Sequence, residues 1–204
     1  MKLIDAIKLS NAEKQNESPF NVPDCGRDEL PEFFCEMGYV VGAEIGVYRG
    51  EFTEKFCKAG LQIYAIDPWL PFVGQGKSEQ RQDMQDYNYD QAKKILSQYK
   101  NCTMVREYSM DALKHFEPKS LDFVYIDGDH RFRYIAEDIS EWYAKVKNGG
   151  VIAGHDYYAT TPSANNLICQ VKPVVDAFIQ TYGITNFYTF GRSDRFLSWM
   201  FIKP

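Results

Sequence analysis

Basic residues, histidines and paired cysteines are all scarce in this 204-residue sequence. Lysine and arginine number 23 against 28 aspartates and glutamates, so the formal net charge is −5. A chain with this balance lacks the positive surface on which a general binder of nucleic-acid backbones depends. The composition therefore argues against nucleic acid as a partner. Only three histidines are present, so the position of each is informative.

Cysteine pairing motifs and long apolar runs are absent as well. The five cysteines are odd in number and never spaced C-x-x-C, so neither a disulfide framework nor a zinc knuckle is expected. No apolar run approaches the roughly 18 residues of a membrane span. Asp5 stands where a signal peptide needs its apolar centre. We therefore expect a soluble, unprocessed protein of the cytoplasm with no membrane partner.

The residues that are abundant indicate a folded domain. Hydrophobic residues make up 45% of the chain and aromatic residues 15%, enough for one well-buried domain. Residues 1–38 form an expected N-terminal helical extension, with Leu3, Ile4 and Ile7 on one helix face and a short helix over 28–37. Two roles stay open for this extension: a lid over a pocket, or a surface for a homo-oligomer.

Residues 39–204 show apolar runs of strand length that alternate with segments of helical period. The expected strands are 40–47, 61–66, 102–106, 121–126, 150–153, 186–190 and 197–203. The expected helices are 52–59, 89–99, 111–116, 132–146 and 171–182. Too few residues join the last two strands for a helical crossover, so these strands pair antiparallel. We predict an α/β fold: a Rossmann-like, seven-stranded, mostly parallel sheet with a C-terminal antiparallel hairpin and helices on both faces.

Two segments, 68–88 and 157–170, are longer than this pattern requires. Both leave from the carboxyl ends of expected strands, which is where ligands bind in open α/β sheets. These segments are candidate walls of a substrate pocket.

A glycine turn joins the first expected strand of the domain to its helix. Gly46 and Gly50 allow a tight turn and a close approach of the backbone to a ligand. The turn departs from a dinucleotide fingerprint because Glu44 faces the position of a pyrophosphate. A carboxylate there repels phosphate and attracts an ammonium or sulfonium group. The plainer alternative is that the two glycines only make a tight turn.

Two further positions fit a nucleoside. Asp67 ends the second strand about 20 residues after the glycine turn, where an acid accepts both hydroxyls of a ribose. With Pro68 behind it, Asp67 is also a candidate turn former. Ser109, Met110 and Asp111 follow the third strand at the level of an adenine edge, although Ser109 is equally a candidate N-cap.

The fourth and fifth strands end in acids and histidines. Asp127, Asp129 and His130 cluster around a glycine after one strand, and His155 and Asp156 follow the next. Titratable groups packed in this way are costly unless they are capped, paired or bound to a metal. Neighbouring strands lie roughly 5 Å apart, so Asp127 and Asp156 are expected to converge on one divalent ion. His130 is the candidate general base, and His155 is either a ligand or a structural residue.

Taken in order, Glu44 with its two glycines, Asp67, the Ser109 turn and Asp127 resemble the class I S-adenosylmethionine-dependent methyltransferases. The strings YIDGDH and GGVIAGHDY resemble more closely the branch that includes the macrocin-type sugar O-methyltransferases. The placement of the acids is similar, more distantly, to that of catechol O-methyltransferase.

This resemblance implies a role for each residue. The methionine end of S-adenosylmethionine would lie against Glu44 and the glycine turn, its ribose against Asp67, and its adenine against the Ser109 turn. The implied cofactor-binding residues are Glu44, Gly46, Gly50, Asp67, Ser109, Met110, Asp111 and Asp127. The implied metal ligands are Asp127, Asp156 and His155, and the implied catalytic residues are His130 and Asp127.

Related enzymes often carry an acidic residue where this chain has His155. Imidazole is a poorer ligand for Mg²⁺ than carboxylate is. The resemblance therefore implies Mg²⁺ or another divalent cation, with a weaker site, a softer metal, or Asp129 as an additional ligand.

The expected activity is methyl transfer to a hydroxyl of a small molecule, with His130 removing the proton. Three alternatives stay open. Asp67 alone would permit a nicotinamide-dependent oxidoreductase, although Glu44 and the missing fingerprint glycine argue against one. A cofactor-binding protein without turnover has the same sequence features. A metal-dependent hydrolase would use only the Asp/His cluster.

Overall fold

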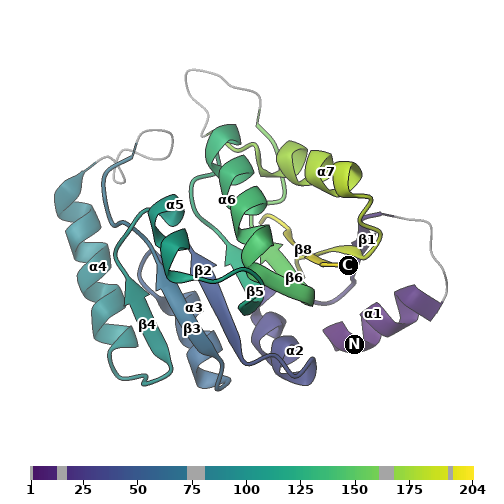
Figure 1. Ribbon diagram of the computed structural model, residues 1–204, viewed down its shortest axis with the longest axis horizontal. Coiled ribbons are helices and arrows are strands. Elements are labelled where there is room, and N and C mark those ends of the chain that lie inside the picture. The colour runs from purple at the N-terminus through teal and green to yellow at the C-terminus, as the bar shows by residue number, and fades with distance from the viewer. Residues whose placement is uncertain (1, 13–17, 73–80, 161–167, 193–194) are drawn as a thin grey trace.

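The computed structural model describes residues 2–12, 18–72, 81–160, 168–192 and 195–204. Its centre is an eight-stranded sheet with the strand order β1-β7-β8-β6-β5-β2-β3-β4 (Figure 1). The strands are β1 (Phe20–Asn21), β2 (Val41–Ile45), β3 (Gln62–Ile66), β4 (Cys102–Val105), β5 (Leu121–Ile126), β6 (Val146–Gly154), β7 (Phe187–Phe190) and β8 (Ser198–Ile202). Strands β2 to β6 run parallel, and β8 pairs antiparallel with both β6 and β7. The predicted α/β fold class is confirmed.

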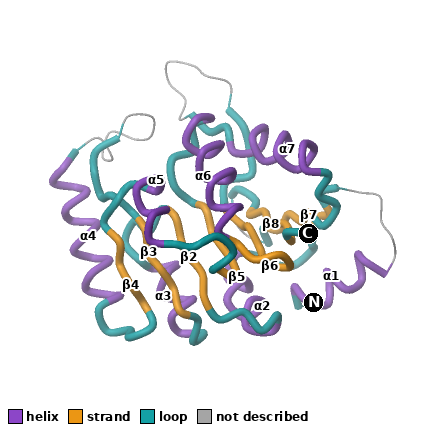
Figure 2. The backbone as a smooth tube through the Cα atoms, in the orientation of Figure 1, coloured by secondary structure: helices purple, strands orange, loops and turns teal. Residues whose placement is uncertain are grey.

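Helices lie on both sides of this sheet (Figure 2). The α-helices are α1 (Leu3–Ala12), α2 (Leu30–Glu36), α3 (Glu51–Lys58), α4 (Gln82–Leu96), α5 (Ser109–Ala112), α6 (Phe132–Lys145) and α7 (Val171–Tyr182). The two 3-10 helices of the described residues are η1 (Arg27–Glu29) and η2 (Leu113–His115). One hydrophobic core packs the helices α1, α2, α3 and α4 against one face of the sheet. A second core packs α5, α6 and α7 against the other face. None of the helices in the described part of the chain is both long and apolar enough to cross a membrane.

Two differences from the predicted elements have physical reasons. Helix α4 begins at Gln82, inside the segment predicted as loop, because it buries the polar Gln85 and Asn88 in line with Ala92 and Leu96. A polar residue at a buried position interrupts the hydrophobic period from which a helix is predicted. Strand β1 adds an eighth strand to the predicted seven, since a strand of two residues has no pattern to detect.

The described part of the N-terminal extension packs against the sheet. Strand β1 pairs parallel with β7, and the Phe34 ring stacks on Phe123 of β5 with 4.2 Å between centroids. Leu30, Phe33 and Phe34 of α2 are all buried. The extension therefore shares a hydrophobic core with residues 39–204. A lid or oligomer role for residues 1–38 stays a prediction.

Candidate functional site

The carboxyl ends of β2, β3, β5 and β6 meet at one edge of the sheet. In the register of the sheet, Ile45 lies opposite both Ile66 and Ile126, and Ile126 lies opposite Gly154. The residues that immediately follow these strands therefore share this edge. It contains the glycine turn, Asp67, Asp127 and the His155-Asp156 pair.

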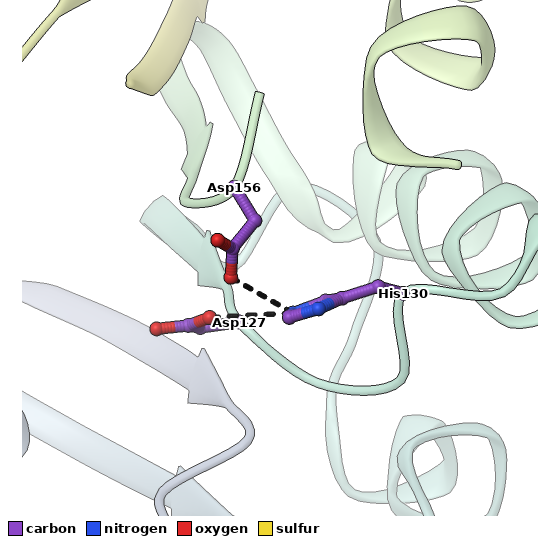
Figure 3. A group of neighbouring side chains, drawn as sticks. All are labelled: Asp127, His130 and Asp156. Atoms are coloured by element: carbon purple, nitrogen blue, oxygen red, sulfur yellow. Dashed lines mark ion pairs between the residues drawn. The ribbon is translucent and has the colours of Figure 1, made fainter. Parts of the chain in front are cut away.

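Asp127, His130 and Asp156 come together at this edge, and their side chains point toward one another (Figure 3). The His130 Nε2 atom lies 3.5 Å from Asp127 Oδ1 and 3.3 Å from Asp156 Oδ2. One ligand atom from each residue lies within 4.8 Å of the other two. The exposed fractions of the three side chains are between 14% and 23%, so a ligand can reach the group. Two carboxylates and an imidazole at these separations form a donor set that suits a divalent cation.

Local backbone structure aims these side chains. Asp127 donates its N–H to the Ile45 carbonyl at 2.8 Å, which ties the end of β5 to β2. Asp156 adopts a left-handed conformation with φ 54°, which few residues other than glycine, asparagine and aspartate tolerate. The loop that carries His130 is held by Gln170, whose N–H donates to the His130 carbonyl and whose Oε1 accepts the Phe132 N–H, each at 2.8 Å.

The charges in this group stabilise one another. Burial favours the neutral form of Asp127, but His130, His155 and Arg27 outweigh it and hold the pKa of this carboxyl below its usual 3.8. Burial likewise opposes the charged form of His130, yet the nearby Asp127 and Asp156 raise its pKa above 6.5. The group therefore favours an ionised Asp127 beside a readily protonated His130 imidazole.

The structure does not bring His155 or Asp129 into this three-residue group. The His155 Nδ1 atom lies 3.3 Å from Asp156 Oδ2, and its buried Nε2 has no hydrogen-bond partner among the described residues. Asp129 instead binds the Arg131 guanidinium through both carboxylate oxygens. The ligand role of His155 stays a prediction.

Asp67 holds the glycine turn in place. Its Oδ2 atom accepts the N–H groups of Val47 and Tyr48 at 3.0 and 3.1 Å, and its Oδ1 atom accepts the Trp69 N–H at 2.7 Å. Burial raises the pKa of Asp67, and these three hydrogen bonds oppose the shift. A carboxylate offers about four acceptor positions, so one remains for a ligand hydroxyl. The turn-forming role of Asp67 therefore leaves room for one ribose hydroxyl, and the predicted contact with both hydroxyls stays a prediction.

Glu44 lies within β2 and is 2% exposed. Burial raises the pKa of its carboxyl well above 4.5, although the Thr53 hydroxyl donates a hydrogen bond to Oε2 and opposes this shift. A buried acid with one neutral partner is stabilised strongly by an incoming cation.

Gly46 is required for contact between two loops of this edge. Its φ is 89°, and a Cβ atom at this position would lie 2.3 Å from the Asp127 carbonyl oxygen. Gly60 has nearly the same φ of 90°, but nothing lies within 4 Å of a Cβ atom placed there. Substitution of Gly60 therefore measures the effect of backbone strain alone, whereas substitution of Gly46 measures strain and close packing together.

We expect Gly46→Ala to lower the free energy of unfolding by about 2–3 kcal/mol, because strain and overpacking add. Gly60→Ala is the matched control and should cost only about 1 kcal/mol, from its positive φ. Urea denaturation of both variants measures the difference. Equal losses would show that the contact with the Asp127 backbone is unimportant.

The three residues predicted to lie against an adenine differ in their surroundings. The Ser109 hydroxyl donates to Asp138 and accepts the Trp142 indole N–H at 2.7 Å, so it is occupied within the protein. Met110 packs partly buried against the second core. Asp111 lines an open cleft of about 270 Å³, whose other lining residues are Pro68, Leu70, Arg106, Glu107, Tyr108 and Lys114.

Asp138 lies beneath this turn, and its burial raises the pKa of its carboxyl from 3.8 to about 7. The folded state therefore binds a proton that the unfolded chain has released, and stability falls as the pH rises from 3.8 towards about 7. The loss is about 1.4 kcal/mol for each unit within this window.

Asp138→Asn keeps an acceptor for the Ser109 hydroxyl and removes the titration. Its stability relative to the unsubstituted protein should increase with pH across this window and then level off, as measured by urea denaturation at a series of pH values. Glu137→Gln removes the adjacent, more exposed carboxylate of α6 and serves as the control. A stability difference that is independent of pH would contradict a raised Asp138 pKa.

The site also contains Arg27, a residue that sequence reasoning missed. Its Nη1 atom lies 3.3 Å from Asp127 Oδ2, and its guanidinium carbon lies 5.1 Å from the centroid of the Phe52 ring. Arg27 belongs to the polar N-terminal extension and is 100 residues from Asp127 along the chain. No local period or motif marks it, so only the fold reveals this contact.

Comparison with known proteins identifies the class. A family model described as a methyltransferase domain matches residues 43–157, which is more than half of the chain. The chain belongs to this family of methyltransferase domains. The match covers the glycine turn, Asp67, the Ser109 turn and the Asp127 group, and it decides against the nicotinamide-dependent oxidoreductase. No curated protein sequence matches the chain.

Solved structures with the same fold include several O-methyltransferases. A candidate caffeoyl-CoA O-methyltransferase from Staphylococcus aureus has a TM-score of 0.63 at 14% identity, over 99% of this chain and 92% of that one. The O-methyltransferase from Bacillus cereus, in complex with S-adenosylhomocysteine, has a TM-score of 0.60 at 13% identity, over 98% and 90%. TomG from Streptomyces achromogenes, an O-methyltransferase of tomaymycin synthesis in complex with S-adenosylmethionine, has a TM-score of 0.61 at 11% identity, over 100% and 90%. These likenesses show the fold.

Proposed function

We propose that this methyltransferase uses S-adenosylmethionine to methylate a hydroxyl oxygen of a small molecule, such as a sugar or a natural-product moiety. The observation that carries the proposal is the His130 imidazole, held within 3.5 Å of two carboxylates at the edge where ligands bind. A neutral hydroxyl is a weak nucleophile and needs such a base. The cofactor complexes of the Bacillus cereus enzyme and TomG support the same cofactor here.

The cofactor is proposed to lie along the edge from β2 to β4. Glu44, the glycine turn and Asp127 face its methionine end, and the remaining acceptor position of Asp67 takes a ribose hydroxyl. The adenine lies at the Ser109-Met110-Asp111 turn, beside the cleft that Asp111 lines. When bound, S-adenosylmethionine supplies an activated methyl group on a sulfonium centre.

A divalent cation is proposed to bind between Asp127 and Asp156, with His155 as a third ligand. The spacing of the two carboxylates fits a cation, and the unpartnered buried Nε2 of His155 suits a ligand role. Because the set mixes imidazole with carboxylates, it suits Mn²⁺ or a similar ion as well as Mg²⁺. A cation bound there would lower the pKa of an acceptor hydroxyl.

The protein's own residues then move the proton. His130 accepts the hydroxyl proton at Nε2, and the two neighbouring carboxylates stabilise the imidazolium that forms. We further propose that the protein acts in the cytoplasm, because its five cysteines are all free thiols, as a reducing compartment favours.

Radiolabelled methyl transfer tests this function. The protein is incubated with methyl-labelled S-adenosylmethionine and a panel of phenols, sugars and amines, with Mn²⁺ or with EDTA. The proposal expects label on a hydroxyl acceptor and loss of transfer when EDTA removes the cation. Transfer to amines alone, or transfer that EDTA leaves unchanged, would contradict it.

A further inference from the structure

Arg27 brings a positive charge from the N-terminal extension into an acidic site. Its guanidinium contacts Asp127 and lies over the Phe52 ring at the start of α3. Burial raises the pKa of Glu44, and the Arg27 charge opposes this shift. About a third of the Arg27 side chain is exposed, so a ligand can reach it.

The backbone around Arg27 is fixed by Arg192, which follows β7. The Arg192 N–H donates to the Cys25 carbonyl at 2.8 Å, and its guanidinium donates to Glu29 Oε1 at 2.6 Å. Glu29 Oε2 in turn accepts the Gly26 N–H at 2.8 Å. The backbone on both sides of Arg27 is therefore held in place, and an exchange of its ionic partner requires movement of the side chain alone. A group that is pre-positioned in this way loses little entropy when it binds.

The acids at this edge of the sheet leave one charged group of the proposed cofactor without an oppositely charged partner. The proposed cofactor carries an ammonium, a sulfonium and a carboxylate at its methionine end. The ionised Asp127 complements the two cations but repels the carboxylate, unless a cation accompanies it. Arg27 is a cation in contact with Asp127, and a guanidinium binds a carboxylate through two parallel hydrogen bonds.

We propose that Arg27 binds the carboxylate of the methionine end of S-adenosylmethionine and exchanges Asp127 for this partner when the cofactor enters. The Phe52 ring holds the guanidinium plane at the site in both states. The exchange also releases Asp127 Oδ2 for the cofactor or a cation. This inference rests on the proposed function, because it assumes that S-adenosylmethionine is the cofactor.

Calorimetric titration with two ligands tests the contact without any acceptor present. Decarboxylated S-adenosylmethionine keeps the sulfonium and the ammonium and lacks only the carboxylate. The full-length protein should bind S-adenosylmethionine about 10- to 100-fold more tightly than the decarboxylated ligand, as a charge-assisted hydrogen-bonded pair requires. In Arg27→Met the affinities for the two ligands should differ by less than about threefold, mainly because S-adenosylmethionine binds more weakly.

Lys55→Met is the matched control. The Lys55 ammonium lies 5.9 Å from the centroid of the same Phe52 ring and pairs with Asp28, so its loss removes a nearby charge without touching Asp127. This variant should keep the full preference for the carboxylate. Thermal unfolding of each variant verifies that it is folded.

Each outcome is distinct. If Arg27→Met keeps the full preference for S-adenosylmethionine, the carboxylate is held elsewhere and the inference is overturned. Equal weakening of both ligands in Arg27→Met would also overturn it, because that result assigns Arg27 a structural role. If the unsubstituted protein binds neither ligand, the proposed function itself fails.

Discussion

His130→Ala should lower kcat about 10²- to 10⁴-fold, because the variant loses the group that accepts the hydroxyl proton. The affinity for S-adenosylhomocysteine should change by less than about threefold, since the proposed cofactor contacts do not include His130. Turnover is measured with the best hydroxyl acceptor of the panel, and affinity by calorimetry. His115→Ala is the control: this histidine lies on the surface, where its Nε2 atom pairs with Glu107 at 3.1 Å.

The base role can be separated from a ligand role for His130. Because its Nε2 atom lies within the same three-residue group, a metal ligand at this position would also fit the geometry. If His130 is the base, Mn²⁺ binds to His130→Ala almost as tightly as to the unsubstituted protein. A large loss of Mn²⁺ affinity together with lost turnover would contradict the base assignment, and unchanged turnover would remove His130 from the mechanism.

Asp127→Asn and Asp156→Asn should each weaken Mn²⁺ binding more than about 100-fold. Loss of a residue that only orients a ligand costs 10- to 100-fold, and a directly binding carboxylate contributes more. Binding is measured by the loss of the free Mn²⁺ signal in electron paramagnetic resonance. His155→Ala should weaken binding as well, although by less, because two carboxylates remain.

Asp129→Asn provides the matched control for charge. Asp129 is close to the group in sequence, but its carboxylate is occupied by Arg131, so this variant loses one negative charge without losing a proposed ligand. Its Mn²⁺ affinity should fall by less than about threefold. Equal losses in Asp127→Asn and Asp129→Asn would indicate a diffuse acidic surface instead of a coordinated cation.

The parts of the fold that sequence predicts well are those with strong local patterns. Strand β5 is buried at every position from Leu121 to Ile126, and its apolar run, interrupted only by Asp122, predicted these bounds. Helix α7 ends at Tyr182 because Gly183 adopts the left-handed conformation after it, a common stop signal. Strand β6 begins at the buried Val146, earlier than the predicted residue 150. The prediction missed this start because the next three residues, Lys147, Asn148 and Gly149, are exposed and do not continue an apolar run.

Site residues could be predicted where the order of the strands alone brings them together. Asp127 and Asp156 follow adjacent parallel strands, so topology alone places them at one edge. The partners of Ser109 could not be predicted, because Asp138 and Trp142 reach it from a helix that is about 30 residues away. Arg27 is still further from its partner along the chain, and a single arginine in a polar segment carries no signal of its own.

The most direct test of the account is a calorimetric titration of the full-length protein with S-adenosylhomocysteine and, separately, with NAD. We expect micromolar or tighter binding of S-adenosylhomocysteine and no binding of NAD, since the glycine turn lacks the full set of glycines of a dinucleotide fingerprint. Binding of NAD without S-adenosylhomocysteine, or binding of neither ligand, would contradict the account.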